Sequence, residues 1–124
     1  MPEQKILIVE DEDLIAQSLI MRLEKEGYEA LRAENGFEGL RAAIKNKPDL
    51  ILLDILMPQM DGLAMLKKLR EHDWGKNARV VLLTNLDDVE NIAQAAEYGV
   101  ADYLVKSDWE LDDVVQKIKD KLAS

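Results

Sequence analysis

Short apolar runs alternate with longer amphipathic stretches from one end of the chain to the other. Residues 6–9, 50–53, 80–83 and 103–105 are continuous apolar runs, which predict strands. Residues 28–33 alternate apolar and charged side chains, so we expect a strand at the sheet edge with one face in water. Strands that alternate with helices are typical of βαβ units around a parallel sheet. The pattern therefore predicts an α/β fold built from five βα units.

Five amphipathic stretches predict the helices that follow these strands. In each stretch, apolar residues recur every three or four positions, so that one face of the helix would be buried. The positions that we expect to face the core are Ile15, Leu19 and Leu23; Phe37, Leu40 and Ile44; Leu63, Leu66 and Leu69; Val89, Ile92, Ala93 and Ala96; and Leu111, Val114, Val115, Ile118 and Leu122. Gly27 and Gly99 predict the ends of the first and fourth helices, and Asn35 with Glu38 predicts an N-cap.

Length and composition favour one domain over residues 1–124. The chain has 124 residues, of which 48% are hydrophobic and 33% charged, with only 3 Pro and 6 Gly. This composition excludes disordered and low-complexity classes, and domains usually have roughly 100–150 residues. The sequence contains neither an apolar run of about 20 residues nor a signal-peptide pattern, so we expect a cytoplasmic protein with no membrane partner.

The charge balance bears on the partners of the protein. With 25 acidic and 16 basic residues, the formal net charge is −9. Such a chain repels the phosphate backbone of nucleic acids, so we expect no direct nucleic-acid partner. The absence of cysteine also excludes disulfide scaffolds and thiolate metal sites.

Polar residues directly follow four of the predicted strands. They are Glu10 and Asp11, Asp54, Thr84 and Lys106. The carboxyl ends of parallel strands meet at one edge of the sheet, where open α/β sheets bind their ligands. Three carboxylates at this edge would repel one another unless a cation neutralised them, and oxygen ligands suit Mg²⁺. The sequence therefore predicts a magnesium site beside a hydroxyl and an ammonium group.

This set of side chains fits the transfer of a phosphoryl group to a carboxylate. Mg²⁺ takes few protein carboxylates and leaves positions for water or phosphate oxygens. A carboxylate can attack phosphorus to form an aspartyl phosphate, while the metal and a lysine neutralise the phosphoryl oxygens and a hydroxyl donates a hydrogen bond. Every component of that chemistry is present among the five residues.

The chain resembles the receiver domain of bacterial two-component response regulators, including the stand-alone chemotaxis type. The segments that carry the resemblance are residues 6–12, 52–62, 82–84 and 99–106, in the right order and spacing. The most specific part is the Asp-x-x-x-Pro-x-x-Asp-Gly stretch that begins at Asp54, taken together with the acidic pair. The resemblance implies a flavodoxin-like three-layer sandwich whose five-stranded parallel sheet has the order 2-1-3-4-5.

The resemblance also implies a phosphoacceptor and a metal site. Asp54 would accept the phosphoryl group. Mg²⁺, or Mn²⁺ in its place, would be held by Glu10, Asp11, Asp54 and the main-chain carbonyl of Leu56. Asp11 would be a direct ligand, and Glu10 would act through water.

The remaining roles concern the phosphoryl group and the signal. Thr84 would bond a phosphoryl oxygen, Lys106 would pair with the phosphate, and the ring of Tyr103 would turn inward as Thr84 moves. The donor would be a sensor histidine kinase or a phosphotransfer protein. The output would be a changed surface of the fourth helix, fifth strand and last helix, read by a downstream protein or a separate output domain. We expect a monomer that can dimerise when phosphorylated, and no enzyme activity beyond self-phosphorylation and self-dephosphorylation.

Several positions depart from the family pattern or tune its chemistry. Ser107 replaces the proline that usually follows the lysine, so we expect a trans bond before it and a capping box with Glu110 that starts the last helix. Asn85 replaces a smaller residue and would slow the entry of a phosphodonor. In this family, the side chains at the positions of Leu56 and Leu86 influence the water molecule that attacks the phosphoryl group. Both are apolar here and cannot orient that water by hydrogen bonding, which predicts slow self-dephosphorylation.

Other functions fit parts of the pattern. An aspartyl phosphatase would need a second acid two residues after Asp54, where this chain has Leu56. A flavin carrier would need hydroxyl and glycine residues in the first loop, which is acidic here. A constitutive, non-phosphorylated scaffold stays open because of Asn85 and Ser107. No output domain is expected before the chain ends at Ser124, so both a stand-alone regulator and a piece of a longer protein fit.

Overall fold

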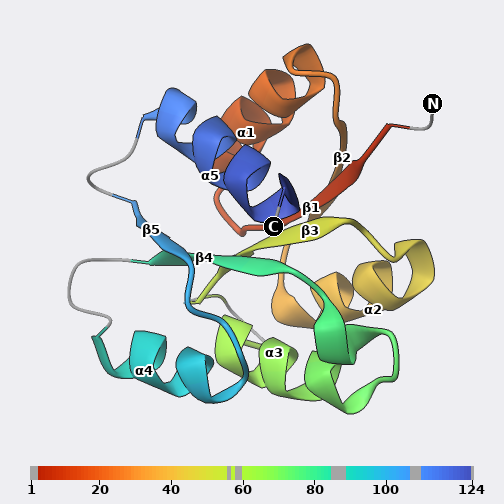
Figure 1. Ribbon diagram of the computed structural model, residues 1–124, viewed down its shortest axis with the longest axis vertical. Helices are drawn as coiled ribbons and strands as arrows, with labels where there is room; N and C mark the ends of the chain where they lie inside the picture. The colour runs from red at the N-terminus through yellow and green to blue at the C-terminus, as the bar shows by residue number, and fades with distance from the viewer. Residues whose placement is uncertain (1–2, 56, 58–59, 85–88, 107–109, 124) are drawn as a thin grey trace.

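A parallel sheet forms the centre of the molecule (Figure 1). The computed structural model describes residues 3–55, 57, 60–84, 89–106 and 110–123. Within these residues the strands are β1 (Lys5–Val9), β2 (Glu29–Ala33), β3 (Leu50–Asp54), β4 (Val80–Thr84) and β5 (Tyr103–Val105). Their order is β2-β1-β3-β4-β5, which confirms the flavodoxin-like arrangement that the resemblance implies.

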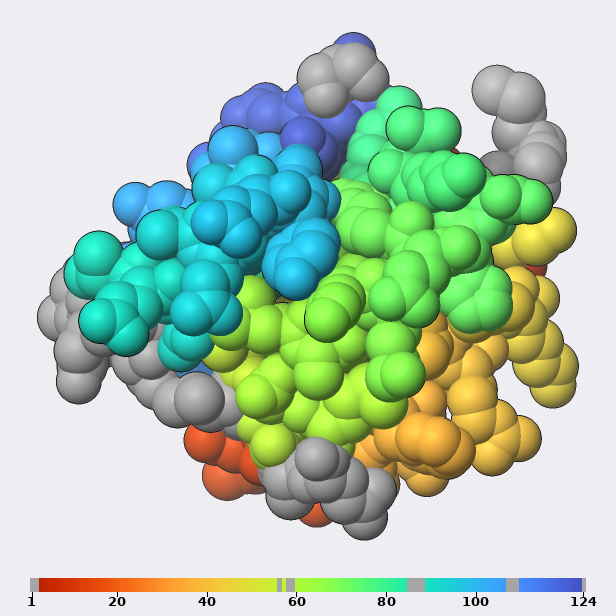
Figure 2. Space-filling model, turned by 90° about the horizontal axis from the view of Figure 1, so that it is seen from below, coloured from red at the N-terminus to blue at the C-terminus, as the bar shows by residue number. Residues whose placement is uncertain are grey.

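Helices cover both faces of this sheet. On one face lie α1 (Asp13–Lys25) and α5 (Leu111–Ala123). On the other lie α2 (Gly36–Asn46), α3 (Gly62–Glu71) and α4 (Val89–Glu97), with the short 3₁₀ helix η1 (Gly75–Asn77) after α3. Figure 2 shows α3 between α2 and α4 on this second face. None of the helices in the described part is long and apolar enough to cross a membrane.

Alternate residues of each strand feed two separate apolar clusters. In β1, Leu7 and Val9 pack on the side of α2, α3 and α4, whereas Ile6 and Ile8 pack on the side of α1 and α5. The strands β3 and β4 are buried along their whole length, which explains why they are continuous apolar runs. The edge strand β2 is only partly buried, as predicted. Burial on both faces holds the carboxyl ends of the central strands in fixed positions.

The predicted core face of α2 is wrong at its first residue. Phe37 is 52% exposed, while the buried residues of this helix include Gly39 and Ala43. A Cβ atom on Gly39 would lie 2.9 Å from the side chain of Val9, so the helix meets β1 through its small residues. This close approach fixes the rotation of α2 and turns Phe37 toward solvent.

The predicted core face of α4 is also wrong. Val89 is 69% exposed, and Ala93 and Ala96 are exposed as well. The helix is buried through Ala95, with Ile92 half-buried one turn earlier. Alanine is compatible with either side of a helix, so the spacing of these residues marks a helix without showing which side packs.

Helix ends agree with the sequence at three positions and differ at one. Gly27 and Gly99 have positive φ values of 96° and 81°, and the Asn35 side chain accepts a hydrogen bond from the Glu38 N–H at 2.9 Å. The predicted capping box of Ser107 and Glu110 is wrong, because Glu110 lies before α5 and not within its first turn. Ser107 itself lies outside the described residues.

The capping role at the start of α5 falls to a later pair of residues. The N–H of Glu110 donates to the carboxylate of Asp113 at 3.1 Å. The carbonyl oxygen of Glu110 accepts hydrogen bonds from the N–H groups of Asp113 and Val114. Glu110 therefore occupies the N-cap position of the last helix, and Asp113 reaches back to it as the acid of a capping box does.

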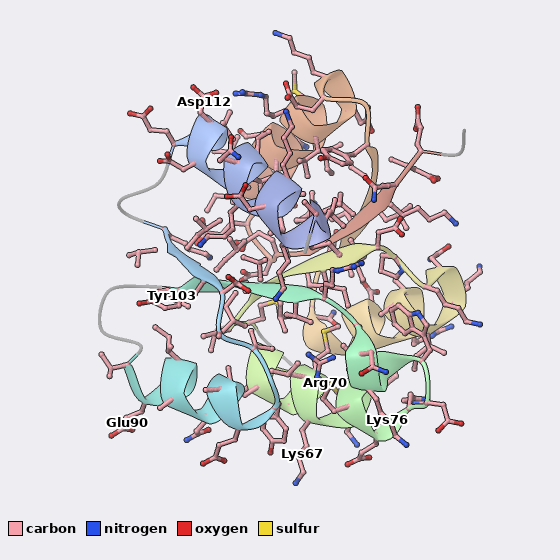
Figure 3. All side chains as sticks on the ribbon, in the orientation of Figure 1. Lys67, Arg70, Lys76, Glu90, Tyr103 and Asp112 are labelled. Atoms are coloured by element: carbon pink, nitrogen blue, oxygen red, sulfur yellow. The ribbon has the colours of Figure 1, made fainter. Side chains whose placement is uncertain are left out.

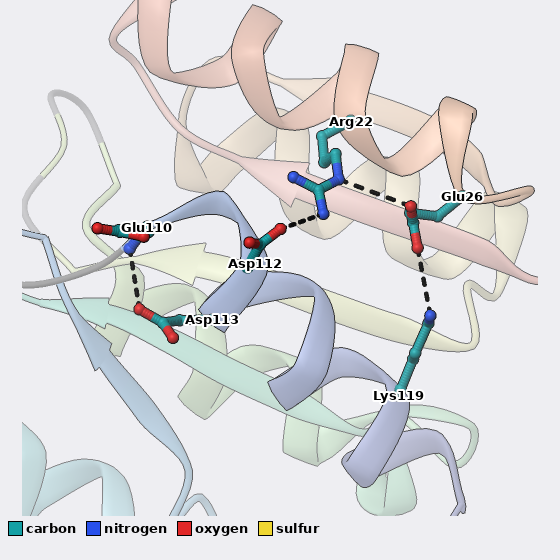
Figure 4. A network of polar contacts seen from close by, with 6 residues as sticks. All are labelled: Arg22, Glu26, Glu110, Asp112, Asp113 and Lys119. Atoms are coloured by element: carbon teal, nitrogen blue, oxygen red, sulfur yellow. Dashed lines mark hydrogen bonds and ion pairs between the residues drawn. The ribbon is translucent and has the colours of Figure 1, made fainter.

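Two arginines connect helices that are far apart in the sequence. Arg22 of α1 bonds Asp112 and lies 3.6 Å from Glu26, which in turn lies 3.2 Å from Lys119 (Figure 4). This network joins α1 to α5. The second arginine, Arg70 of α3 (Figure 3), donates at 2.7–2.8 Å to three main-chain carbonyls: those of Tyr98 just after α4, Gly75 in η1 and Ala78 just after η1.

Candidate functional site

The carboxyl ends of β1 and β3 bring three carboxylates together. Glu10 follows β1 directly, Asp54 is the last residue of β3, and Asp11 begins the loop to α1. One ligand atom from each lies within 4.8 Å of those of the other two. Glu10 is 0% exposed and Asp54 4% exposed, whereas Asp11 is exposed. The cluster is therefore buried on the sheet side and open to solvent at Asp11.

Lys106 supplies the cation that faces two of these carboxylates. Its Nζ lies 3.0 Å from Oδ2 of Asp54 and 3.1 Å from Oε2 of Glu10. The Lys106 N–H donates to the carbonyl oxygen of Thr84 at 2.7 Å, which fixes the end of β5 against β4. The structure thus brings Lys106 to the acidic cluster from the opposite half of the sheet.

Burial and nearby charges shift the pKa values of both Asp54 and Lys106. Burial raises the pKa of Asp54 from 3.8 to about 7, and the charge of Glu10 adds to this rise while Lys106 opposes it. Burial alone would lower the pKa of Lys106, but its contacts with Asp54 and Glu10 raise that pKa above the ordinary value. Lys106 therefore stays an ammonium group, and Asp54 is held in an environment that disfavours its negative charge.

The start of α3 packs directly on the main chain of Asp54. The Asp61 side chain caps α3 by accepting from the Ala64 N–H at 2.8 Å, and the Gly62 N–H donates to the Ile55 carbonyl at 2.8 Å. A Cβ atom on Gly62 would lie 2.3 Å from the Asp54 carbonyl oxygen, so only glycine allows this approach. The Asp-Gly pair of the motif thus positions the end of β3.

Thr84 has a buried hydroxyl group without a partner. The residue ends β4 and is 1% exposed, and within the described residues its Oγ1 has no hydrogen-bond partner. A buried polar group left unpaired costs about 1–3 kcal/mol. A ligand oxygen at this edge of the sheet would remove that penalty.

The other predicted site residues fall into two groups. Tyr103 lies on β5 with 43% exposure, so in this structure its ring is outward (Figure 3). Leu56, Asn85, Leu86 and Ser107 lie outside the described residues. The Leu56 carbonyl ligand, the slower entry of a phosphodonor past Asn85, the effect of Leu56 and Leu86 on the attacking water and the trans bond before Ser107 therefore stay predictions.

The donor set fits a hard divalent cation. Each of the three carboxylates offers an oxygen, and Lys106 is the ammonium group paired with two of them. One positive charge leaves an excess of negative charge when all three acids are ionised, which a divalent ion would neutralise. Oxygen-only ligands with one solvent-exposed side suit Mg²⁺ or Mn²⁺, which keep water in part of their coordination shell.

The role of one residue beside the site was not predicted from the sequence. Arg32 of β2 contacts both ends of the short acidic loop, through the Glu10 carbonyl at 3.1 Å and through Asp13, the first residue of α1, at 2.8 Å. Its place in an alternating edge strand had indicated only a side chain in water. No local pattern reveals that the start of α1 lies over this position.

Sequence comparisons with known proteins agree with this geometry. A family model described as the response regulator receiver domain matches residues 6–119. The transcriptional regulatory protein SrrA of Staphylococcus aureus is 42% identical over 102 residues, which cover 82% of this chain and 41% of that protein. The chain thus spans about two fifths of the length of the curated relatives it matches.

Solved structures show the same fold over nearly the whole chain. The chemotaxis response regulator CheY4 of Vibrio cholerae has a TM-score of 0.89 and 28% identity, covering 97% of this chain and 99% of that one. The signal receiver domain of a signal transduction histidine kinase from Syntrophus aciditrophicus has a TM-score of 0.86 and 34% identity, covering 97% and 90%.

Proposed function

Because the chain belongs to the response regulator receiver domain family, we propose that it is a signalling switch controlled by a phosphoryl group on Asp54. The observation that carries the proposal is the position of Lys106, whose Nζ lies 3.0 Å from Asp54 at the open edge of the sheet. The unpartnered hydroxyl of Thr84 at the same edge supports it. Together these groups offer a nucleophile, a cation and a hydrogen-bond donor to one phosphoryl group.

The acidic residues have two tasks in this proposal. Glu10, Asp11 and Asp54 would hold Mg²⁺ or Mn²⁺, with the Leu56 carbonyl as the further ligand that the family resemblance implies. The bound ion neutralises charge on the phosphoryl oxygens. Asp54 must be ionised to attack phosphorus, and Lys106 favours this ionised form through its ion pair.

The phosphoryl group would come from the phosphohistidine of a sensor histidine kinase or a phosphotransfer protein. An oxygen of Asp54 forms the new bond to phosphorus while the bond from phosphorus to the histidine nitrogen breaks. Lys106 then faces a phosphoryl oxygen, and the Thr84 hydroxyl gains an acceptor. The chemistry of the chain itself is limited to gaining and losing this group.

The output surface in this proposal is formed by α4, β5 and α5. The side chains of Val89 and Tyr103 are exposed on α4 and β5 in this structure, so a partner can reach them. Movement of Thr84 toward the phosphoryl group would draw the ring of Tyr103 inward and change this surface. The reader of the change would be a downstream protein, an output domain or a second copy of the chain.

Intact-mass spectrometry tests the proposal. The protein is incubated with a small phosphodonor such as acetyl phosphate, with Mg²⁺ or with EDTA, and then with a histidine kinase if no adduct forms. We expect a gain of about 80 Da that needs Mg²⁺ and is absent from Asp54→Asn. The matched control is Asp73→Asn, because Asp73 is a fully exposed acid that pairs with the surface residue Lys76.

Two results would contradict the proposal. One is an adduct of the same yield on the Asp54→Asn variant, which would place the phosphoryl group elsewhere. The other is no adduct from either donor, which would favour the constitutive scaffold. The complete set of acidic, hydroxyl and ammonium groups at the sheet edge argues against that scaffold.

A further inference from the structure

Arg32 joins the edge strand β2 to the loop that carries the acidic residues. Its Nη1 lies 2.8 Å from Oδ1 of Asp13, and its Nη2 donates to the main-chain carbonyl of Glu10 at 3.1 Å. The side chain is largely buried, with 19% exposure. The guanidinium group therefore contacts this loop on both sides of Asp11.

Asp11 depends on its backbone for its position. The residue is exposed, and among the described residues its carboxylate has no hydrogen-bond or ion-pair partner. Near it, the Glu10 N–H donates to the Ala33 carbonyl at 3.1 Å, and the Glu12 N–H donates to the Glu10 side chain at 3.3 Å. Among the side-chain hydrogen bonds and ion pairs of the described residues, those of Arg32 are thus the ones that tie this loop and the start of α1 to β2.

We propose that Arg32 is a positioning residue for the divalent-cation site. By holding both flanks of Asp11, it keeps the Asp11 carboxylate within ligand distance of Glu10 and Asp54. This inference rests on the proposed function, since it matters only if the three carboxylates bind an ion. It assigns to an edge-strand residue a role in metal affinity without direct contact with the metal.

The charge of Arg32 acts in the opposite direction to its contacts. A free guanidinium near the site would repel a divalent cation and weaken its binding. In this structure the charge is paired with the carboxylate of Asp13, so the field of the pair at the site is small. We therefore expect the loss of positioning to exceed the relief of repulsion, so that loss of Arg32 weakens metal binding.

Lysine can replace only part of this arrangement. The planar guanidinium fork reaches an acid and a carbonyl at the same time, whereas an ammonium group on a flexible stem favours one partner. Arg32→Lys keeps the positive charge and one of the two contacts, whereas Arg32→Met removes the charge and both contacts. A graded series of variants thus separates the effect of geometry from that of charge.

Calorimetric titration of the metal-free protein with Mg²⁺ tests the inference. We expect Arg32→Met to raise the Kd about tenfold, as loss of a residue that orients a ligand does, and Arg32→Lys to lie between this variant and the wild type. Arg41→Met is the matched control, because it removes an equal charge from an exposed position on α2 and should change the Kd less than twofold. An unchanged or lower Kd for Arg32→Met would overturn the inference.

Phosphorylation kinetics supply a second readout, which a merely structural role would not produce. In Arg32→Met, the Mg²⁺ concentration for half-maximal phosphorylation should rise by the same factor, while the rate at saturating Mg²⁺ returns to within about twofold of the wild type. A rate that stays low at saturating Mg²⁺ would contradict a role in metal affinity. Urea unfolding in EDTA verifies that the variant is folded, and Arg32→Lys decides the question if it is not.

The Asp11→Asn variant separates this inference from the proposed function. If the wild type binds Mg²⁺ no better than Asp11→Asn, the acidic site itself fails and with it the proposed function. If the wild type binds and Asp11→Asn does not, while Arg32→Met matches the wild type, only the role of Arg32 is refuted. The Asp13→Asn variant should also weaken binding, and its effect should shrink in the Arg32→Met background because the two residues act as a pair.

Discussion

Replacing Asp54 with asparagine should stabilise the metal-free protein above neutral pH. The Asp54 side chain is almost completely buried, and burial together with the charge of Glu10 raises its pKa from 3.8 to about 7. The folded state therefore disfavours the ionised form, which water stabilises in the unfolded chain. Asparagine keeps the shape of the side chain and removes the charge that is penalised.

The size and pH dependence of the effect follow from the two pKa values. The gap between 3.8 and about 7 amounts to about 4 kcal/mol at 1.36 kcal/mol per pH unit. Water at the open edge of the site screens part of this, so we expect a gain of about 1–3 kcal/mol. Below about pH 4 both states are protonated and the gain is absent. It grows as the pH rises from about 4 to 7 and is complete above that range.

Urea unfolding in EDTA at about pH 4.5 and pH 8 measures this gain. Added Mg²⁺ should shrink it, because the ion stabilises the folded wild type but lacks one of its ligands in the variant. Asp73→Asn serves as the control and should leave stability unchanged at both pH values, since Asp73 is fully exposed. The reasoning is refuted if Asp54→Asn is no more stable than the wild type at pH 8, or if its gain is equal at both pH values.

Three further predictions concern the backbone and the lifetime of the switch. Lys47 has a φ of 49° at the end of α2, so Lys47→Gly should raise stability by about 0.5–1 kcal/mol in thermal unfolding, and a loss would contradict this. Gly62→Ala should lower stability by about 1–3 kcal/mol and slow phosphorylation, because the new methyl group would lie 2.3 Å from the Asp54 carbonyl oxygen. A variant as stable and as active as the wild type would contradict this prediction. Leu56 and Leu86 cannot orient a water molecule, so the phosphoryl group should survive for minutes or longer when its decay is followed by mass, and a half-life of seconds would exclude slow turnover.

The sequence predicted the strands better than the rotation of the helices. Residues 50–53 could be interpreted as a buried strand because burial on both faces makes every position apolar. The exposure of Phe37 and Val89 could not be predicted, because spacing marks a helix while contacts from distant segments select its buried side. In α2 that selection comes from Gly39, which lets the helix approach Val9 closely.

The site shows the same division between local and distant information. The convergence of Asp54 and Lys106 was predictable, because parallel strands bring residues that follow them to one edge. The contacts of Arg32 depend on where α1 begins over the edge strand, and no spacing within either segment encodes this. The unpartnered hydroxyl of Thr84 likewise became visible only once the surroundings of β4 were known.

The network between α1 and α5 has a consequence for how the protein is made. Its contacts join Arg22 to Asp112 and Glu26 to Lys119, across 90 and 93 residues of sequence. During synthesis, the sheet face that carries Ile8 and Leu52 is covered by α1 alone until the ribosome has released α5. The nascent chain therefore exposes an apolar surface until α5 emerges, and transiently exposed apolar surface of this kind is what chaperones bind.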